Sequence, residues 1–226
     1  MTSTLPGLPE PIPLPELSET EALKAALALA DEPGRALLGI TGAPGAGKST
    51  YAEWLVDAVN HSGRSAVLVP MDGFHLAQSA LESLGLADVK GAPATFDAAG
   101  YVELLRRVRE PADEVLWAPR FDRALEDSIA ASLPIEPMVN LVVTEGNYLL
   151  LPQGHWWLVR LQLDACWFVD VDEDVRHERL QARHERFGRP PEAAAERTLG
   201  SDEANARLVN RTRGEADATV RPPSLG

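Results

Sequence analysis

The sequence predicts an α/β fold in which a parallel, doubly wound sheet is flanked by helices. Three observations support this class. Short apolar runs of strand length recur along the chain, segments with helical spacing of apolar residues separate them, and the runs are continuously apolar. Alternating strand and helix patterns are typical of parallel sheets, and continuously apolar strands indicate a sheet that is covered on both faces.

Local patterns predict the elements in order. A capping box at Ser18 and Glu21 predicts a helix over 22–29. Strands are predicted at 36–41, 65–70, 114–118, 138–144 and 165–171, with a short edge strand at 217–220 and a polar, charged loop after residue 118. Further helices are predicted over 51–59, 98–109, 174–187 and 201–210. Five prolines before residue 16 predict a flexible arm over 1–17, followed by a single domain at 18–226.

Composition narrows the partners that are expected. The 226 residues carry a formal net charge of -13, and such an acidic surface repels nucleic acid and anionic membranes. No apolar run approaches membrane-spanning length, and the N-terminus lacks a basic-then-apolar signal pattern. The single cysteine, Cys166, lies in an apolar run, where burial is expected, and fits a reducing compartment. We therefore expect a cytoplasmic protein without nucleic acid or membrane partners.

Residues 42–50 form the most informative motif. They fit the pattern G-x-x-x-x-G-K-[S/T] and lie between a predicted strand and a predicted helix, which is the context of a phosphate-binding loop, or P-loop. The backbone N–H groups of such a loop and the helix N-terminus bind phosphate oxygens. The motif predicts a bound nucleoside triphosphate, and its residues are Gly42, Ala43, Pro44, Gly45, Ala46, Gly47, Lys48, Ser49 and Thr50.

Acidic residues follow the predicted strands, where ligands of parallel sheets bind. Asp72 is a candidate general base for a hydroxyl proton, although an Asp before Gly73 is also common in plain turns. Glu145 is a candidate Mg²⁺ ligand together with the hydroxyl of Ser49. For Asp170, a helix cap or a loop role is equally consistent with the sequence.

A basic helix near the C-terminus is the second informative stretch. The spacing of Arg176, Arg179, Arg183 and Arg186 places these residues along one helical face, with Arg189 just beyond. Arginines can stabilise charge on a transferring phosphoryl group, so residues 174–191 are a candidate lid. The alternative is a solvated helix face whose arginines pair with neighbouring acids.

The ordered set of motifs resembles the P-loop small-molecule kinases of the phosphoribulokinase/uridine kinase family, which includes type I pantothenate kinases. The resemblance covers about residues 36–190 and rests on segments 42–50, 71–75, 95–97, 119–123 and 144–148, with the arginine-rich lid. It implies a P-loop fold with a helical lid. It also implies that Asp72 is the base, that Lys48, Arg179 and Arg183 act on the phosphates, and that Glu145 lies beside Mg²⁺. Substrate contacts are expected from His75, which follows Asp72, and from the loops that hold Phe96, Asp97, Arg120, Asp122 and Arg123.

The function expected from these residues is transfer of the γ-phosphoryl group of ATP, with Mg²⁺, to a hydroxyl of a small metabolite. Nucleoside, pantothenate-like and sugar acceptors stay open, because Gly73, Phe74 and His75 depart from the uridine kinase sequence and the chain lacks the length of pantothenate kinases. The alternative is a P-loop protein that hydrolyses or senses a nucleotide without such an acceptor. The guanine-binding segment Asn-Lys-x-Asp of GTPases does not occur in the sequence. The sequence leaves the nucleotide preference and a homodimer open.

Overall fold

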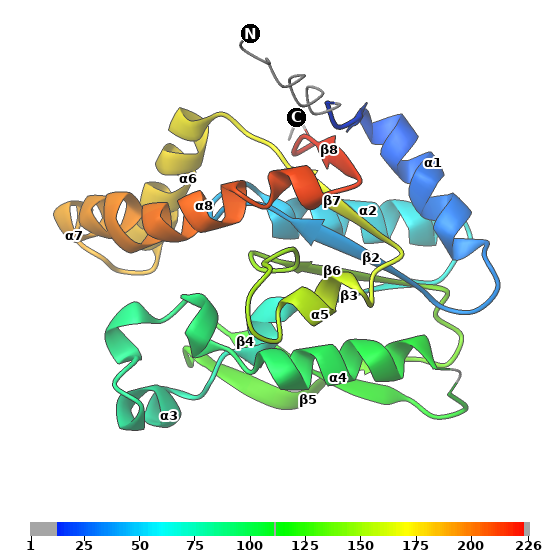
Figure 1. The fold of residues 1–226 in the computed structure, drawn as a ribbon, viewed down its shortest axis with the longest axis horizontal. Coiled ribbons are helices and arrows are strands. Elements are labelled where there is room, and N and C mark those ends of the chain that lie inside the picture. The colour runs from blue at the N-terminus through cyan, green and yellow to red at the C-terminus, as the bar shows by residue number, and fades with distance from the viewer. Residues whose placement is uncertain (1–12, 111, 224–226) are drawn as a thin grey trace, which may run out of the picture.

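A computed structural model describes residues 13–110 and 112–223, and its centre is a six-stranded sheet (Figure 1). The strands are β1 (Glu16–Leu17), β2 (Ala36–Thr41), β3 (Ala66–Pro70), β6 (Leu141–Gly146), β7 (Ala165–Val169) and β8 (Ala218–Val220). They lie in the order β1-β8-β7-β2-β6-β3, and every neighbouring pair is parallel. The predicted parallel α/β fold is confirmed.

Helices cover both faces of the sheet. They are α1 (Glu19–Ala30), α2 (Lys48–His61), α3 (Gln78–Ser83), α4 (Ala98–Arg109), α5 (Trp157–Arg160), α6 (Glu173–Arg186), α7 (Pro191–Arg197) and α8 (Glu203–Asn210). Neighbouring residues of β2 point to opposite faces, so Leu38 packs with α1 and α2, and Leu37 packs with α4, α5 and α8. Each face therefore has its own apolar core, and Cys166 is buried in the second of them, as expected.

The predicted strand at 114–118 does not join this sheet. It belongs to a separate antiparallel hairpin of β4 (Leu116–Asp122) and β5 (Asp127–Ile135), and the prediction of a loop after residue 118 was wrong. Only one face of this hairpin packs on the core. Ala118 is therefore buried beside an exposed Trp117, and β5 carries mixed polar and apolar residues that resemble a loop sequence.

The N-terminal arm also differs from the prediction. Residues 16 and 17 form β1, which pairs with β8 through Glu16–Thr219 and Leu17–Val220. The flexible arm was therefore predicted too far along the chain, and β8 is not an edge strand because β1 lies outside it. A two-residue strand is too short to leave an apolar pattern. The rest of the predicted arm, residues 1–12, lies outside the described residues.

The C-terminal helices lie beside the carboxyl ends of the strands (Figure 1). Helix α6 matches the prediction over 174–187, and α7, a π-helical turn (Thr198–Asp202) and α8 continue the same segment. Within residues 13–110 and 112–223, no helix is long and apolar enough to cross a membrane.

Candidate active site

The phosphate loop connects the fully buried strand β2 to the first turn of α2. Gly45 and Gly47 have φ angles of 81° and 92°, which favour glycine, and Gly47 is the N-cap of α2. Lys48, the first residue of the helix, is 8% exposed, and its amine donates a hydrogen bond to the Ala43 carbonyl at 3.1 Å. Burial lowers the pKa of Lys48, while the nearby Glu145 and Asp72 oppose that change. A phosphate in the loop would give this buried cation a partner.

Two carboxylates face the loop from neighbouring strands. Glu145, near the end of β6, is 6% exposed and accepts a hydrogen bond from the Ser49 hydroxyl at 3.1 Å. Burial, with the nearby Asp72, raises the pKa of Glu145 to about 7, although Lys48 and the Ser49 hydrogen bond lower it. Ser49 and Glu145 thus bring two oxygen donors together, and oxygen donors are the ligands that Mg²⁺ prefers. The donor set fits the predicted metal.

Asp72 lies in a short 3₁₀ turn (Met71–Phe74) directly after β3. Its carboxylate forms an ion pair with Arg123 at 3.2 Å, so the hairpin β4–β5 contributes to the site. Gly73 explains one departure from the uridine kinase sequence, because a Cβ there would collide with the Pro119 carbonyl on β4. The close approach of these two segments places Asp72 and Arg123 side by side.

An aromatic cluster continues from Asp72. The ring centroid of His75 lies 4.0 Å from that of Phe96 and 4.7 Å from that of Phe121. His75 Nδ1 lies 2.9 Å from the Asp72 carbonyl oxygen, which can only accept, so this nitrogen is the donor. Burial lowers the pKa of His75, and the neutral ring therefore leaves Nε2 free to accept a hydrogen bond.

These groups surround one cavity of about 620 Å³. Among the predicted residues, the cavity lining contains Pro44, Lys48, Ser49, Asp72, His75, Phe96, Arg123, Glu145 and Arg183. The structure does not bring Asp97, Arg120 or Asp122 into the lining. Asp97 caps α4 by accepting a hydrogen bond from the Gly100 N–H at 2.8 Å, and Asp122 accepts from the Ala124 N–H at 2.8 Å in the hairpin turn.

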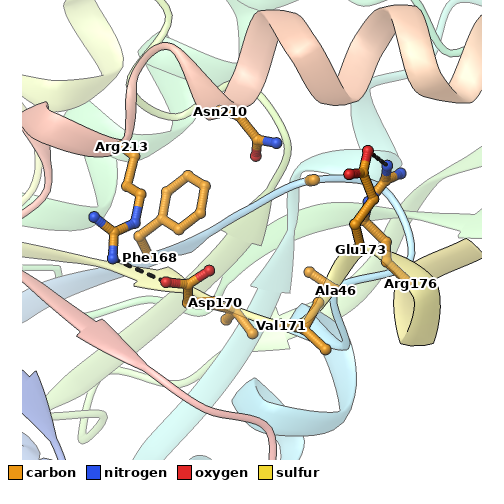
Figure 2. A pocket seen from close by; sticks show the side chains of 10 residues that line it. Ala46, Phe168, Asp170, Val171, Glu173, Arg176, Asn210 and Arg213 are labelled. Atoms are coloured by element: carbon orange, nitrogen blue, oxygen red, sulfur yellow. Dashed lines mark hydrogen bonds and ion pairs between the residues drawn. The ribbon is translucent and has the colours of Figure 1, made fainter.

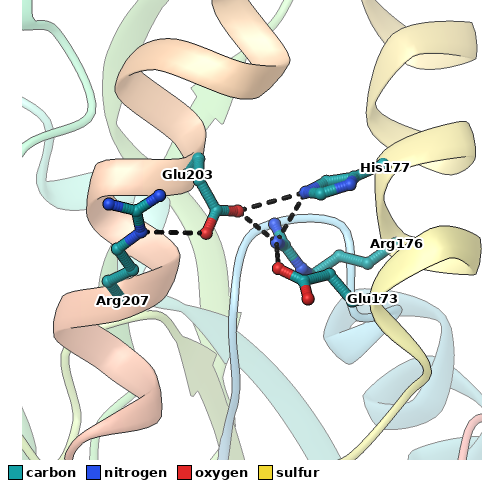
Figure 3. Close-up of polar contacts among 5 residues, drawn as sticks. All are labelled: Glu173, Arg176, His177, Glu203 and Arg207. Atoms are coloured by element: carbon teal, nitrogen blue, oxygen red, sulfur yellow. Dashed lines mark hydrogen bonds and ion pairs between the residues drawn. The ribbon is translucent and has the colours of Figure 1, made fainter.

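The arginines of α6 have different surroundings. Arg183 lines the cavity. Arg179 lies beside the phosphate loop instead, because its Nη1 atom is 3.3 Å from the position that a Cβ atom on Gly47 would occupy. Arg176 is 3% exposed and forms a buried ion pair with Glu203 on α8 (Figure 3). A 3-4-3 spacing places arginines on one side of a helix, but it does not say which of them meet phosphates and which meet another helix.

Helix α6 meets α8 in a polar cluster that includes Glu173, His177 and Glu203. These three residues offer possible ligand atoms within 4.8 Å of one another, as in a metal site. However, the Arg176 guanidinium lies among them and contacts both carboxylates (Figure 3). The cluster therefore already contains its cation and is a structural link between the two helices.

A smaller cavity of about 250 Å³ lies between the phosphate loop, the end of β7 and α8 (Figure 2). Asp170 lines it and forms an ion pair with Arg213 at 2.8 Å. Both side chains are about half exposed. Of the two roles that the sequence left open for Asp170, this contact favours the structural one.

Several lining residues were not predicted as site residues. They are Gln78, Ala87, Lys90, Gly91, Phe121, Glu126, Gly146, Asn147, Leu180, His184, Phe187, Gly188, Arg189, Arg197, Asp202 and Asn205. Asn147 and Phe121 lie inside quoted motifs and could have been included. No local pattern marks Arg197 or Asn205, because they reach the cavity only through the packing of α7 and α8.

Comparisons with known proteins agree with this geometry. Residues 37–223 match the model of the "Phosphoribulokinase / Uridine kinase family". A Schizosaccharomyces pombe protein, C227.14, named as a candidate uridine kinase, is 32% identical over 216 residues, which are 92% of each chain. A pantothenate kinase of Enterococcus faecalis is 31% identical over 60% of this chain and 45% of its own.

A solved structure from Silicibacter sp. TM1040, described as a candidate fructose transport system kinase, superposes with a TM-score of 0.79 and 36% identity. The superposition covers 87% of this chain and 98% of that one. The residues of the phosphate loop, the acidic strand ends and the family match together show that this chain belongs to the phosphoribulokinase/uridine kinase family and is an ATP-dependent small-molecule kinase that phosphorylates a hydroxyl.

Proposed function

We propose that the chain transfers the γ-phosphoryl group of ATP, with Mg²⁺, to a hydroxyl of a small metabolite that binds between Asp72 and the aromatic cluster. The observation that carries this proposal is the single cavity that holds both Lys48 of the phosphate loop and Asp72. A phosphate-binding half and a candidate base in one cavity are what transfer to an acceptor requires, whereas a sensor needs only the first.

Each residue has a chemical role in this proposal. The Asp72 carboxylate accepts the proton of the acceptor hydroxyl, whose oxygen forms a bond to the γ-phosphorus while the bond to the β–γ bridging oxygen breaks and ADP leaves. Lys48 and Arg183 stabilise the negative charge on the phosphoryl oxygens. Ser49 and Glu145 would hold Mg²⁺, which neutralises phosphate charge when bound.

Residues that flank the phosphate loop would hold the rest of the nucleotide. Arg179 Nη1 and Pro222 Cγ lie 3.3 and 3.4 Å from the position of a Cβ on Gly47, so both flank the start of this helix. We place the nucleoside part of ATP beside them. Contacts from Asp97, Arg120 and Asp122 to the acceptor stay predictions. The single domain over 18–226 with a lid at 174–191 is also still a prediction. The same holds for a cytoplasmic location, a homodimer and the absence of nucleic acid partners.

An ATP-consumption screen tests this function. The full chain is incubated with Mg²⁺, ATP and a panel of hydroxylated metabolites, and products are identified by mass spectrometry. We expect Asp72→Asn to abolish transfer and to leave ATP binding within about threefold, because the amide keeps the shape but cannot take a proton. Asp88→Asn, at an exposed position outside the cavity, is the matched control. Fast hydrolysis without any acceptor would instead support the nucleotide-hydrolysing alternative.

A further inference from the structure

The cavity lining carries an excess of positive charge in an acidic chain. In the whole chain, 34 acidic residues outnumber 21 Lys and Arg, yet the cavity lining holds six Lys and Arg and only four Asp and Glu. Lys48 and Arg183 belong to the phosphate half. The cations that remain include Lys90, Arg123 and Arg197, which come from three segments far apart in the sequence.

Two of these cations have only neutral partners. Lys90 Nζ donates to the Glu126 carbonyl at 2.6 Å, and Arg197 Nη2 donates to the Lys90 carbonyl at 2.8 Å. In residues 13–110 and 112–223, no carboxylate oxygen lies within 4.0 Å of the charged nitrogens of Lys90 or Arg197. Both residues are only partly exposed, so water compensates their charge less than it would at an open surface.

One aromatic ring lies near two of the cations. Lys90 Nζ lies 5.5 Å from the Phe121 ring centroid, and Arg123 Cζ lies 5.8 Å from it. Both are cation–π distances, so the Phe121 ring stabilises both cations at the cavity.

A group that recognises hydroxyls lies next to this charge. His75 contacts Phe121 as well, and its Nε2 is free to accept a hydrogen bond because Nδ1 donates to the Asp72 carbonyl. The cavity lining therefore offers a hydroxyl acceptor and the candidate base together with cations. This combination suits a molecule that carries both hydroxyls and negative charge.

We propose that the phosphoryl acceptor is a small hydroxylated anion, and that Lys90 and Arg197, together with Arg123, bind its carboxylate or phosphate while its hydroxyl reaches Asp72. This inference rests on the proposed kinase function. The same transfer applies, with the proton passing from the acceptor hydroxyl to Asp72 and the phosphoryl group from ATP to the hydroxyl oxygen.

Calorimetric titration of the full chain tests the inference. The protein is first saturated with Mg²⁺ and a non-hydrolysable ATP analogue, which occupies the phosphate loop. The titrants are two matched pairs, glycerate against glycerol and ribose 5-phosphate against ribose. We expect at least one anion to bind tenfold or more tightly than its neutral partner, with an affinity that falls as NaCl is raised. Carboxylate and phosphate recognition are distinguished by which pair shows the preference.

Variants assign the preference to the named residues. Lys90→Gln and Arg197→Gln should each weaken binding of the anion by about 10- to 100-fold, the effect of losing a hydrogen bond to a charged group, and should leave the neutral partner unchanged. Lys24→Gln and Arg107→Gln, at exposed positions outside the cavity, are the controls. Thermal melts confirm that each variant is folded.

The outcomes distinguish a failure of the anionic acceptor from a failure of the proposed kinase function. If the analogue binds and Lys48→Ala abolishes that binding, the nucleotide half is established independently. The inference is overturned if neutral partners then bind as well as the anions, if no anion binds, or if Lys90→Gln and Arg197→Gln have no effect. If the analogue itself fails to bind, the proposed kinase function fails first.

Discussion

The ion pair between Arg176 and Glu203 should carry a large share of the stability of the helical segment beside the active site. We consider Glu203→Gln, which keeps the side-chain size but removes the charge. The Arg176 side chain is 4% exposed and that of Glu203 is 12% exposed, so the substitution leaves a guanidinium with little solvent. Glu173, whose carboxylate lies 3.6 Å from Arg176, compensates only in part because its side chain is 68% exposed.

The magnitude follows from two estimates. Removing one partner of a buried ion pair costs about 3–5 kcal/mol. Burial alone would raise the pKa of Glu203, but hydrogen bonds from His177, Arg176 and Arg207 hold it at about 2, below the ordinary 4.5. At about 1.4 kcal/mol for each pH unit between these values, the carboxylate stabilises the fold by about 3 kcal/mol at neutral pH. For a chain of this size, that loss lowers Tm by about 6–12 °C.

The pH dependence separates this cause from a packing defect. A lowered pKa stabilises the fold above the unfolded value of 4.5, and the stabilisation is lost as the pH falls toward 2. Urea unfolding should therefore show a difference of about 3 kcal/mol between the parent chain and Glu203→Gln at pH 7, and less than about half of that difference at pH 3. Glu178→Gln, at an exposed position on α6, the helix that carries Arg176, should change neither value by more than about 0.5 kcal/mol. A difference that is equal at both pH values, or below about 0.5 kcal/mol at pH 7, would refute the reasoning.

Two further substitutions test the phosphate half of the site. Gly45→Ala should weaken ATP binding and lower Tm, because its Cβ would lie 2.6 Å from Leu180 Cγ and 2.9 Å from the Arg176 carbonyl; Gly34→Ala, with a similar φ of 93° and nothing within 4 Å, controls for backbone strain alone. Glu145→Gln should raise the Mg²⁺ concentration needed for half-maximal turnover by tenfold or more, while the metal-free protein melts at the same or a higher temperature because a buried charge is gone. An unchanged Mg²⁺ requirement would remove Glu145 from the metal site.

Sequence patterns were sufficient to predict a structural feature wherever that feature depends on one local segment. The phosphate loop is such a case, because its strand, turn and helix are contiguous and each leaves its own pattern. The positions of Asp72 and Glu145 followed from a second rule, that parallel strands place their carboxyl ends at one edge of the sheet. Neither rule needs knowledge of side-chain packing, and the structure does place Asp72, Glu145 and Lys48 around one cavity.

Some predicted site residues lie outside the cavity lining, because one residue type can serve several purposes in a protein. Asp97 and Asp122 follow or precede secondary structure elements, where a carboxylate can cap backbone N–H groups as readily as it can meet a substrate. Arg176 and Arg183 occupy equivalent places in the helical pattern, yet the first meets Glu203 and the second lines the cavity. Such differences depend on which helix packs opposite, and that information is not local.

The acceptor side shows why this limit matters for function. The carbonyls of Lys90 and Gly91 are contacted by Tyr148 at 2.5 Å, by Arg197 at 2.8 Å and by Asn205 at 3.5 Å. The segment that holds Lys90 is thus fixed by one residue after β6 and by one residue each from α7 and α8. The shape of the proposed acceptor site therefore depends on contacts between residues more than 50 positions apart in the sequence. A relative can keep every motif of the phosphate half and still bind a different acceptor if these distant contacts change, and this explains why the shared motifs predict the reaction better than they predict the substrate.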